Sequence, residues 1–359
     1  MRVTQRDIAG MAGVSQATVS RVLANDDRVE DSIRRRVRQA MREHNYRPDV
    51  RARALRKQRT GLLGLVVKRS QGGLAHDPFF GALTGAIVER LSGQPYHLCV
   101  DMASSDLSHE ALYDEMLRSR RVDGLILVES EARDERILRL QQDRFPFVVI
   151  GNPSEAEGVL SVDNDNVHAG EVAARHLFAN GYRRVGFLGA RVGVTVSDDR
   201  IEGFLRAGGD PSLVWHADFG AGAAREAARE FLGEAKGAAR PDALVVLDDF
   251  MAMGVVGVAR ELRLSVPGDL GIVGFNDTAL SSLLDEGLTS VGLDMPRLVG
   301  LALDRLLAAV EGKDAPQDPR AIVPAQLVAR GSSAGPSRRD PEDRRAEEAG
   351  SRPRSEASK

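Results

Sequence analysis

Cysteine is almost absent from this chain: Cys99 is the only one in 359 residues, so a framework of intrachain disulfides is excluded. Aromatic residues make up 4% of the sequence, and no apolar run approaches the roughly 20 residues of a membrane-spanning helix. The first residues lack the apolar segment of a signal peptide. We therefore expect a cytoplasmic protein with no membrane partner, and we interpret Cys99 as an ordinary core residue.

The sequence also lacks the short motifs of common enzymes. It has no Gly-x-x-x-x-Gly-Lys-[Ser/Thr] phosphate loop, no Gly-x-Ser-x-Gly elbow and no His-Glu-x-x-His zinc motif. Its seven histidines show no metal-ligand spacing. We therefore expect a binding protein without a cofactor or a metal site, and not an enzyme.

Positive charge is gathered at one end of the chain. The whole chain has a net charge of −3, yet residues 1–60 carry +8 and residues 61–330 carry −12. A basic segment of this kind indicates a polyanionic partner such as nucleic acid. The alternative is a solvated basic surface without a partner, and charge alone favours neither.

From residue 61 onward, short apolar runs alternate with helical segments. The runs expected to be strands are 62–67, 97–100, 124–128, 147–151, 184–189, 243–247 and 271–275. This alternation predicts parallel sheets covered on both faces. About 270 residues are too many for one such sheet, so we expect two lobes with a ligand cleft between the carboxyl ends of their strands. Residues 331–359 have almost no large apolar side chain and are expected to be a disordered tail.

Residues 3–46 show the pattern of a helix-turn-helix. A small-residue turn, Ala12-Gly13-Val14, precedes a helix whose first exposed residues are Gln16 and Ala17, with Arg21 one turn later. The amino-terminal side chains of such a helix reach base edges in the major groove, where Gln pairs with adenine and Arg with guanine. Short hydroxyl side chains that suit phosphate contacts are Thr4, Ser15, Thr18 and Ser20.

Together these motifs resemble the LacI/GalR family of bacterial transcription regulators. The resemblance begins with V-S-Q-A-T-V-S-R-V-L at 14–23 and Y-R-P at 46–48. It continues in the same register through five further segments, at 78–80, 121–126, 181–185, 273–277 and 288–291. A helix-turn-helix motif alone is only a moderately specific sign of this family. The same motif joined to this α/β body is a highly specific sign of it.

The resemblance implies an N-terminal all-α helix-turn-helix domain followed by an α/β two-lobed domain like the periplasmic binding proteins. The implied boundaries are a DNA-binding domain at 1–48, a hinge helix or linker at 49–60 and an effector-binding and dimerisation domain at 61–330. Within that last domain, lobe 1 would span about 61–162 and 292–320. Lobe 2 would span about 163–291 and 321–330.

The resemblance also implies roles in DNA binding. Gln16, Ala17 and Arg21 would read the operator, and residues 49–57 would form a hinge helix on specific DNA. Leu55 would be wedged into the minor groove, with Ala52 packed beside it; the alternative is a linker leucine that packs on its own domain. Two departures are Asp49, where the family usually has Asn, and Glu30, a weaker N-cap than the usual Ser or Thr.

A small-molecule effector site is implied between the lobes. The matching residues, which would hold hydroxyl groups and a sugar ring, are Phe79, Arg200, Phe219, Asp248 and Asn276. The alternatives are a surface charge cluster for Arg200, next to Asp198 and Asp199, and plain core positions for the two phenylalanines. Asn152 lies where several relatives carry a polar or charged contact and is a weaker candidate. Two departures are Asn276, where Asp is more frequent in relatives, and Leu293, where relatives often have Gln.

The expected function is a DNA-binding repressor whose operator affinity is controlled by a small molecule, a mono- or oligosaccharide. Two DNA-binding heads on one pseudopalindromic operator imply a homodimer, with helices at 79–91 and 107–120 in its interface. No leucine heptad of a tetramerising helix is present. A transport-type sugar receptor would share the body, but it would need an export signal and no DNA-binding head.

Overall fold

The computed structural model describes residues 3–23, 26–46, 59–67, 77–102, 115–154, 156–234 and 240–336. They divide into two compact units, one ending at Gly61 and the other starting at Leu62. The hinge expected at 49–57, with Ala52 and Leu55, lies outside the described residues, as does most of the segment 107–120.

The first unit is a three-helix domain with α1 Gln5–Met11, α2 Gln16–Leu23 and α3 Asp31–Glu43. Apolar side chains at helical spacing meet in its centre, where Ile8, Val19 and Val37 are completely buried. The turn between α1 and α2 passes through Gly13 at φ +62°, a backbone conformation that favours glycine. The helix-turn-helix predicted from the sequence is therefore present.

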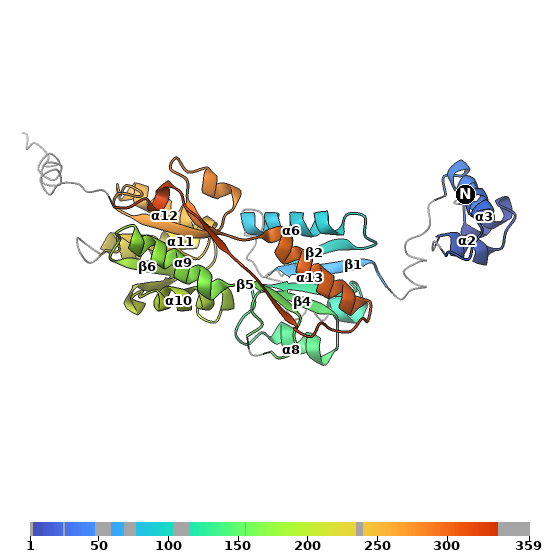
Figure 1. The fold of residues 1–359 in the computed structure, drawn as a ribbon, viewed down its shortest axis with the longest axis horizontal. Helices are drawn as coiled ribbons and strands as arrows, with labels where there is room; N and C mark the ends of the chain where they lie inside the picture. The colour runs from blue at the N-terminus through green and yellow to red at the C-terminus, as the bar shows by residue number, and fades with distance from the viewer. Residues whose placement is uncertain are drawn as a thin grey trace, which may run out of the picture. The chain divides into compact units, whose positions relative to one another are not determined.

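The second unit contains two six-stranded sheets, each covered by helices on both faces (Figure 1). The first sheet has the order β11-β5-β4-β3-β1-β2, and we call it with its helices the first lobe. Its strands are β1 Leu62–Val67, β2 His97–Met102, β3 Gly124–Val128, β4 Phe147–Ile150, β5 Ser161–Asn164 and β11 Arg320–Val323. Its helices are α6 Pro78–Leu91, α8 Glu135–Gln142 and α13 Met295–Val310.

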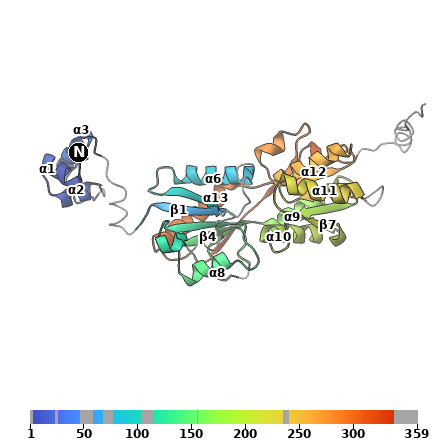
Figure 2. The ribbon, with the colours of Figure 1, turned by 180° about the vertical axis from the view of Figure 1, so that it is seen from behind.

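The second lobe is built on the sheet β12-β10-β9-β8-β6-β7 (Figure 2). Its strands are β6 Val185–Gly189, β7 Val214–His216, β8 Ala243–Val246, β9 Gly271–Asn276, β10 Thr289–Gly292 and β12 Gln326–Val328. Its helices are α9 Asn166–Ala179, α10 Thr195–Arg206, α11 Ala221–Glu234 and α12 Asp249–Glu261. All described strand pairs in both sheets are parallel except β10 with β12.

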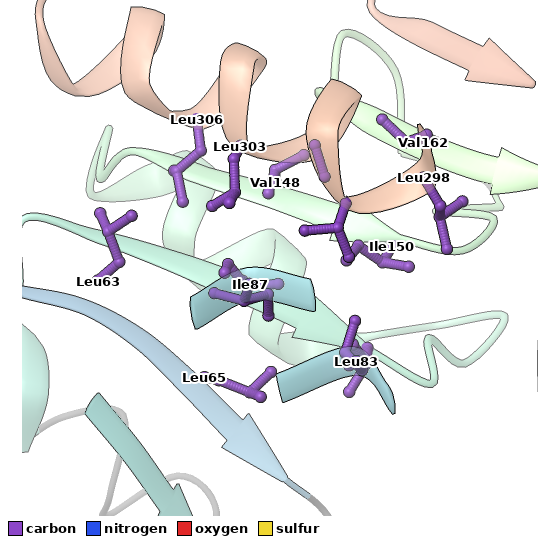
Figure 3. Close-up of a cluster of buried hydrophobic side chains, with 14 of the residues drawn as sticks. Leu63, Leu65, Leu83, Ile87, Val148, Ile150, Val162, Leu298, Leu303 and Leu306 are labelled. Atoms are coloured by element: carbon purple, nitrogen blue, oxygen red, sulfur yellow. The ribbon is translucent and has the colours of Figure 1, made fainter. Parts of the chain in front are cut away.

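The alternation of side chains along the strands explains why their sequences are apolar throughout. In β1, Leu63 and Leu65 pack under α6 and α13, whereas Val66 packs on the opposite face near α8. Figure 3 shows the first of these two cores, where Leu83 and Ile87 of α6 face the strands. Both faces of the sheet are buried, so a continuous apolar run is the expected pattern of such a strand.

The chain passes between the lobes three times: after β5, after β10 and between β11 and β12. Two of the expected boundaries need correction. Residues 163 and 164 belong to the first lobe because β5 ends at Asn164. Residues 321–323 also belong to the first lobe, because β11 pairs with β5 and Val323 is buried in the first core.

The expectation of a disordered segment beginning at 331 is wrong for its first residues. A short turn, η4 Gly331–Ser333, packs against the second lobe, and Ser332 and Ser333 are almost completely buried. The Ser332 hydroxyl accepts from the Thr289 amide at 2.8 Å and donates to the Ile272 carbonyl at 2.7 Å. Composition did not predict this because hydrogen bonds, and not apolar side chains, hold the segment. Residues 337–359 lie outside the described residues.

Candidate functional site

A cleft of about 680 Å³, partly open to solvent, lies between the two lobes at the carboxyl ends of their strands. That volume includes space that is open to solvent. All five effector residues expected from the sequence line it: Phe79, Arg200, Phe219, Asp248 and Asn276. Leu293 also lines the cleft, whereas Asn152 is not part of its wall.

Arg200 lies at the base of the cleft on α10 and is only 3% exposed. Its Nε donates to Asn166 Oδ1 at 3.0 Å, its Nη1 donates to the Leu247 carbonyl at 2.6 Å, and its guanidinium stacks 4.2 Å above the Phe275 ring. Burial lowers the pKa of Arg200 to about 10, so the group stays cationic at neutral pH. The alternative of a surface charge cluster at Arg200 is therefore wrong.

Three polar residues at the first crossover were not predicted as cleft residues. They are Asp163 and Asn164 at the end of β5 and Asn166 at the start of α9. Asp163 accepts from the Asn164 amide at 2.8 Å and from Asn166 Nδ2 at 2.9 Å. Burial raises the pKa of Asp163 to about 6. The available signal was the general rule that polar residues directly after a buried strand reach the cleft.

Asp248 and Asn276 reach the cleft from the ends of β8 and β9. Asp248 caps α12 by accepting from the Met251 amide at 2.6 Å, which fixes the position of its carboxylate. Asn276 has φ +92°, which turns the chain sharply at the end of β9. The neighbouring Asp249 is fully buried and accepts from the hydroxyls of Ser281 and Ser290, so it is structural. Of the neighbouring pairs Asp248-Asp249 and Asn276-Asp277, the first residue of each lines the cleft.

Apolar surface from both lobes completes the cleft. Phe79, at the start of α6, is half-buried and packs edge-on against Phe80 with ring centroids 5.5 Å apart. Phe219 is also half-buried and precedes α11. Both rings therefore pack on their own lobes and contribute to the cleft wall at the same time. Aromatic faces beside hydrogen-bonding groups suit a ligand with an apolar ring face and a polar rim.

The helix α2 presents a polar outer face in the first unit. Gln16, Ala17 and Arg21 are exposed, while Val19 and Val22 on the opposite side are buried. Two of the predicted hydroxyl residues also cap helices: Thr4 accepts from the Asp7 amide, and Ser15 accepts from the Thr18 amide. Ser20 and Thr18 are partly exposed. Glu30 makes no side-chain cap at α3, as its residue type suggested.

In the part of the chain that the structure describes, no cluster of three or more His, Cys, Asp or Glu side chains could hold a metal ion. Among the same residues, no helix has both the length and the apolar character needed to cross a membrane.

Comparison with known proteins identifies both units. Residues 4–49 match the family described as bacterial regulatory proteins, lacI family, and residues 174–333 match the periplasmic binding protein-like domain. The HTH-type transcriptional regulator MalR of Streptomyces coelicolor is 33% identical over 344 residues, which are 91% of this chain and 96% of that protein.

Two solved structures extend the likeness to the fold. A complex of the transcriptional regulator CelR with cellobiose has a TM-score of 0.70 and 27% identity, and the match covers 92% of this chain and all of the other. The lac repressor dimer bound to operator and the anti-inducer ONPF has a TM-score of 0.78 and 25% identity, with 93% and 99% covered. The chain therefore belongs to the LacI family of DNA-binding transcriptional regulators, whose members are not enzymes.

Proposed function

We propose that this regulator is a cytoplasmic repressor whose affinity for its operator is controlled by a mono- or oligosaccharide bound in the cleft. The observation that carries the proposal is the cleft itself, in which a buried guanidinium, several carboxylates and aromatic faces meet. Such groups bind the hydroxyls and the apolar face of a sugar ring. The cellobiose in the CelR complex and the ONPF in the lac repressor complex support this class of ligand.

The proposed DNA contacts follow from the exposed face of α2. Gln16, Ala17 and Arg21 read base edges, while Thr4, Ser15, Thr18 and Ser20 contact phosphates. Ala52 and Leu55 belong to the proposed hinge helix, where Leu55 enters the minor groove.

Two DNA-binding heads on a pseudopalindromic site require a homodimer. The lac repressor relative is a dimer on its operator. On this chain α6 carries Val88, which is 58% exposed, and we propose α6 as part of the dimer interface.

A thermal-shift screen of mono- and disaccharides on the full chain tests the sugar proposal, because ligand binding raises the melting temperature by mass action. At least one saccharide should stabilise the wild type. The same saccharide should fail to stabilise Arg200→Ala. The matched control is Arg206→Ala, which removes an exposed arginine from the same helix and should respond as the wild type does. An equal thermal shift in both variants would show that Arg200 does not contribute to saccharide binding.

A further inference from the structure

Asn166 lies between the buried arginine of the cleft and the buried carboxyl group of Asp163. The side chains of Asn166, Arg200 and Asp163 belong to residues that are each only 3% exposed. Asn166 Oδ1 accepts from Arg200 Nε at 3.0 Å, and Asn166 Nδ2 donates to Asp163 Oδ1 at 2.9 Å. The same Nδ2 donates to the Asn164 carbonyl at 3.3 Å. A cationic group and a carboxyl group are therefore joined through a neutral amide.

The partners of the Asn166 amide fix the direction in which it faces. Its oxygen meets an arginine, which can only donate, and its nitrogen meets a carboxyl oxygen and a carbonyl oxygen, which accept. Turning the amide over would set donor against donor and acceptor against acceptor. Asn166 is also the first residue of α9, whose start is capped by Asp165 accepting from the His168 amide at 3.1 Å. The backbone and the side chain of Asn166 are therefore both held in place.

The amide occupies only part of the Arg200 guanidinium. Arg200 Nη1 donates to the Leu247 carbonyl, and the Phe275 ring covers one face of the group. Among the described residues none accepts a hydrogen bond from Nη2, and Arg200 lines the cleft. A carboxylate in the place of the amide would have two oxygens, which match the arginine fork and pair with Nε and Nη2 together. An amide has one oxygen, so it holds Nε and leaves Nη2 available to a ligand.

We propose that Asn166 is a positioning residue for ligand binding, which orients the Arg200 guanidinium so that Nη2 is presented to a molecule in the cleft. This role rests on the proposed function, because it concerns how a saccharide is held. Asp163 contributes by accepting from the amide nitrogen, which keeps the amide oxygen turned toward Arg200. Other charged groups that act on Asp163 or Arg200 include Asp199, Arg320, Asp248 and Asp249. They remain in place in the variants that test the role of Asn166.

The NMR signal of the Arg200 Nε–H group tests this positioning with no saccharide added. The full chain is labelled with isotope-enriched arginine, and Arg200→Lys identifies the signal. At pH 5.5 the wild-type proton should exchange slowly with water, because Asn166 Oδ1 holds it. Asn166→Ala removes the acceptor and should speed this exchange by about tenfold or more, whereas Asn166→Asp should keep it slow. Equal exchange in the wild type and Asn166→Ala, or fast exchange in Asn166→Asp, would overturn the proposal.

Asn166→Asp also gives a prediction that depends on pH. Its new carboxyl group faces Asp163 Oδ1 where the amide nitrogen donates at 2.9 Å, and two carboxylates so close repel each other. At pH 5.5 a proton shared by the two groups replaces the lost N–H donor, so the new side chain keeps the orientation of the amide. At pH 8.0 this proton is released, and the new carboxylate turns toward Arg200 and pairs with Nη2 as well as Nε. Nη2 is then no longer available to a ligand.

Calorimetric titration of the full chain at both pH values measures the consequence for binding. The probe is the saccharide that stabilises the wild type most in the thermal-shift screen described above. Asn166→Asp should bind it within about threefold of the wild type at pH 5.5, and about tenfold or more weakly than the wild type at pH 8.0. A ratio of variant to wild-type affinity that is the same at both pH values would overturn the positioning role.

The matched control is Asn180→Asp at the other end of α9. It breaks the bond from Asn180 Nδ2 to the Ser333 carbonyl, outside the cleft. This variant should melt at a lower temperature but bind the saccharide as the wild type does at both pH values. A pH-dependent loss of binding in Asn180→Asp equal to that in Asn166→Asp would reduce Asn166 to a structural residue. A screen in which no saccharide binds would contradict the proposed function alone, and the exchange of the Arg200 Nε–H group would then decide the role of Asn166.

Discussion

One buried guanidinium organises the cleft at the scale of single residues. Arg200 is held by Asn166 and the Leu247 carbonyl, and the carboxylates of Asp248 and Asp163 offset part of the cost of burying its charge. The sequence alone could not decide between a ligand contact and a surface cluster, because Asp198 and Asp199 precede this arginine. Burial decides it, and burial depends on α9, which is distant in sequence.

The pKa of Asp163 gives a prediction with a definite sign. Its folded pKa of about 6 lies above the usual value near 3.8, so the folded state binds the proton more tightly than the unfolded state does. The ionised carboxylate therefore destabilises the fold at pH 7.5, and this penalty falls as the pH drops through 6. Asp163→Asn should raise the free energy of unfolding by about 1–3 kcal/mol at pH 7.5.

Urea unfolding of both proteins at pH 7.5 and pH 5.0 measures this effect. The difference between the wild type and Asp163→Asn should shrink clearly at pH 5.0, where the wild-type carboxyl is mostly protonated. A variant that is less stable at pH 7.5, or a difference that does not change with pH, would contradict this prediction. Either result would show that neighbouring groups fully offset the cost of burying the Asp163 carboxylate.

At the scale of elements, the contact between α9 and α10 positions the arginine. A Cβ added at Gly203 would lie 1.9 Å from the Val167 carbonyl oxygen, and one added at Gly170 would lie 2.0 Å from the Arg200 carbonyl oxygen. The two helices therefore meet backbone to backbone, and this close approach brings Arg200 to Asn166.

Gly203→Ala should separate these helices. We expect a loss of about 1–3 kcal/mol in the free energy of unfolding from overpacking, together with loss of saccharide binding. Gly222→Ala in α11 is the matched control, because a Cβ there meets no atom within 4 Å and should stabilise that helix by about 0.5–1 kcal/mol. Equal stability of both variants in thermal melts would contradict the close contact.

The segment after β12 gives a second prediction for an element. Ser333 bonds the imidazole of His176 at 2.7 Å and accepts from Asn180 Nδ2 through its carbonyl at 2.7 Å. A chain that ends after residue 330 loses these bonds and those of Ser332, so it should be about 2–5 kcal/mol less stable. A chain that ends after residue 336 keeps them and should melt like the full chain. Identical melting of the two truncated chains would show that the segment contributes nothing.

Whether a strand could be predicted from the sequence depended on how many of its side chains are apolar. Strands such as β1, β3 and β8 were expected because both of their faces are buried, which leaves an apolar run in the sequence. The strand β5, with the sequence S-V-D-N, was not expected, since its last two side chains are polar and serve the cleft. The short strands β11 and β12 were also missed, because pairing with strands far away in the sequence stabilises them.

At the scale of the whole molecule, a basic three-helix unit and an acidic two-lobed unit share one chain. The five cleft residues expected from family resemblance all line one cleft, although they come from two helices, two strand ends and one loop. This agreement supports a sensor in which a bound molecule changes how strongly the first unit holds DNA. Coupling of about 1–3 kcal/mol between the two sites corresponds to a 5–150-fold change in DNA affinity.

The most direct test is to select binding sites for the full chain from random duplex DNA. The affinity for the selected site is then measured against random DNA, with and without the saccharide that stabilises the protein. Our account predicts a pseudopalindromic site bound at least about a thousandfold more tightly than random DNA, with an affinity that the saccharide changes 5–150-fold in wild type but not in Arg200→Ala. Equal affinity for selected and random DNA, or a site whose affinity no saccharide changes, would contradict it.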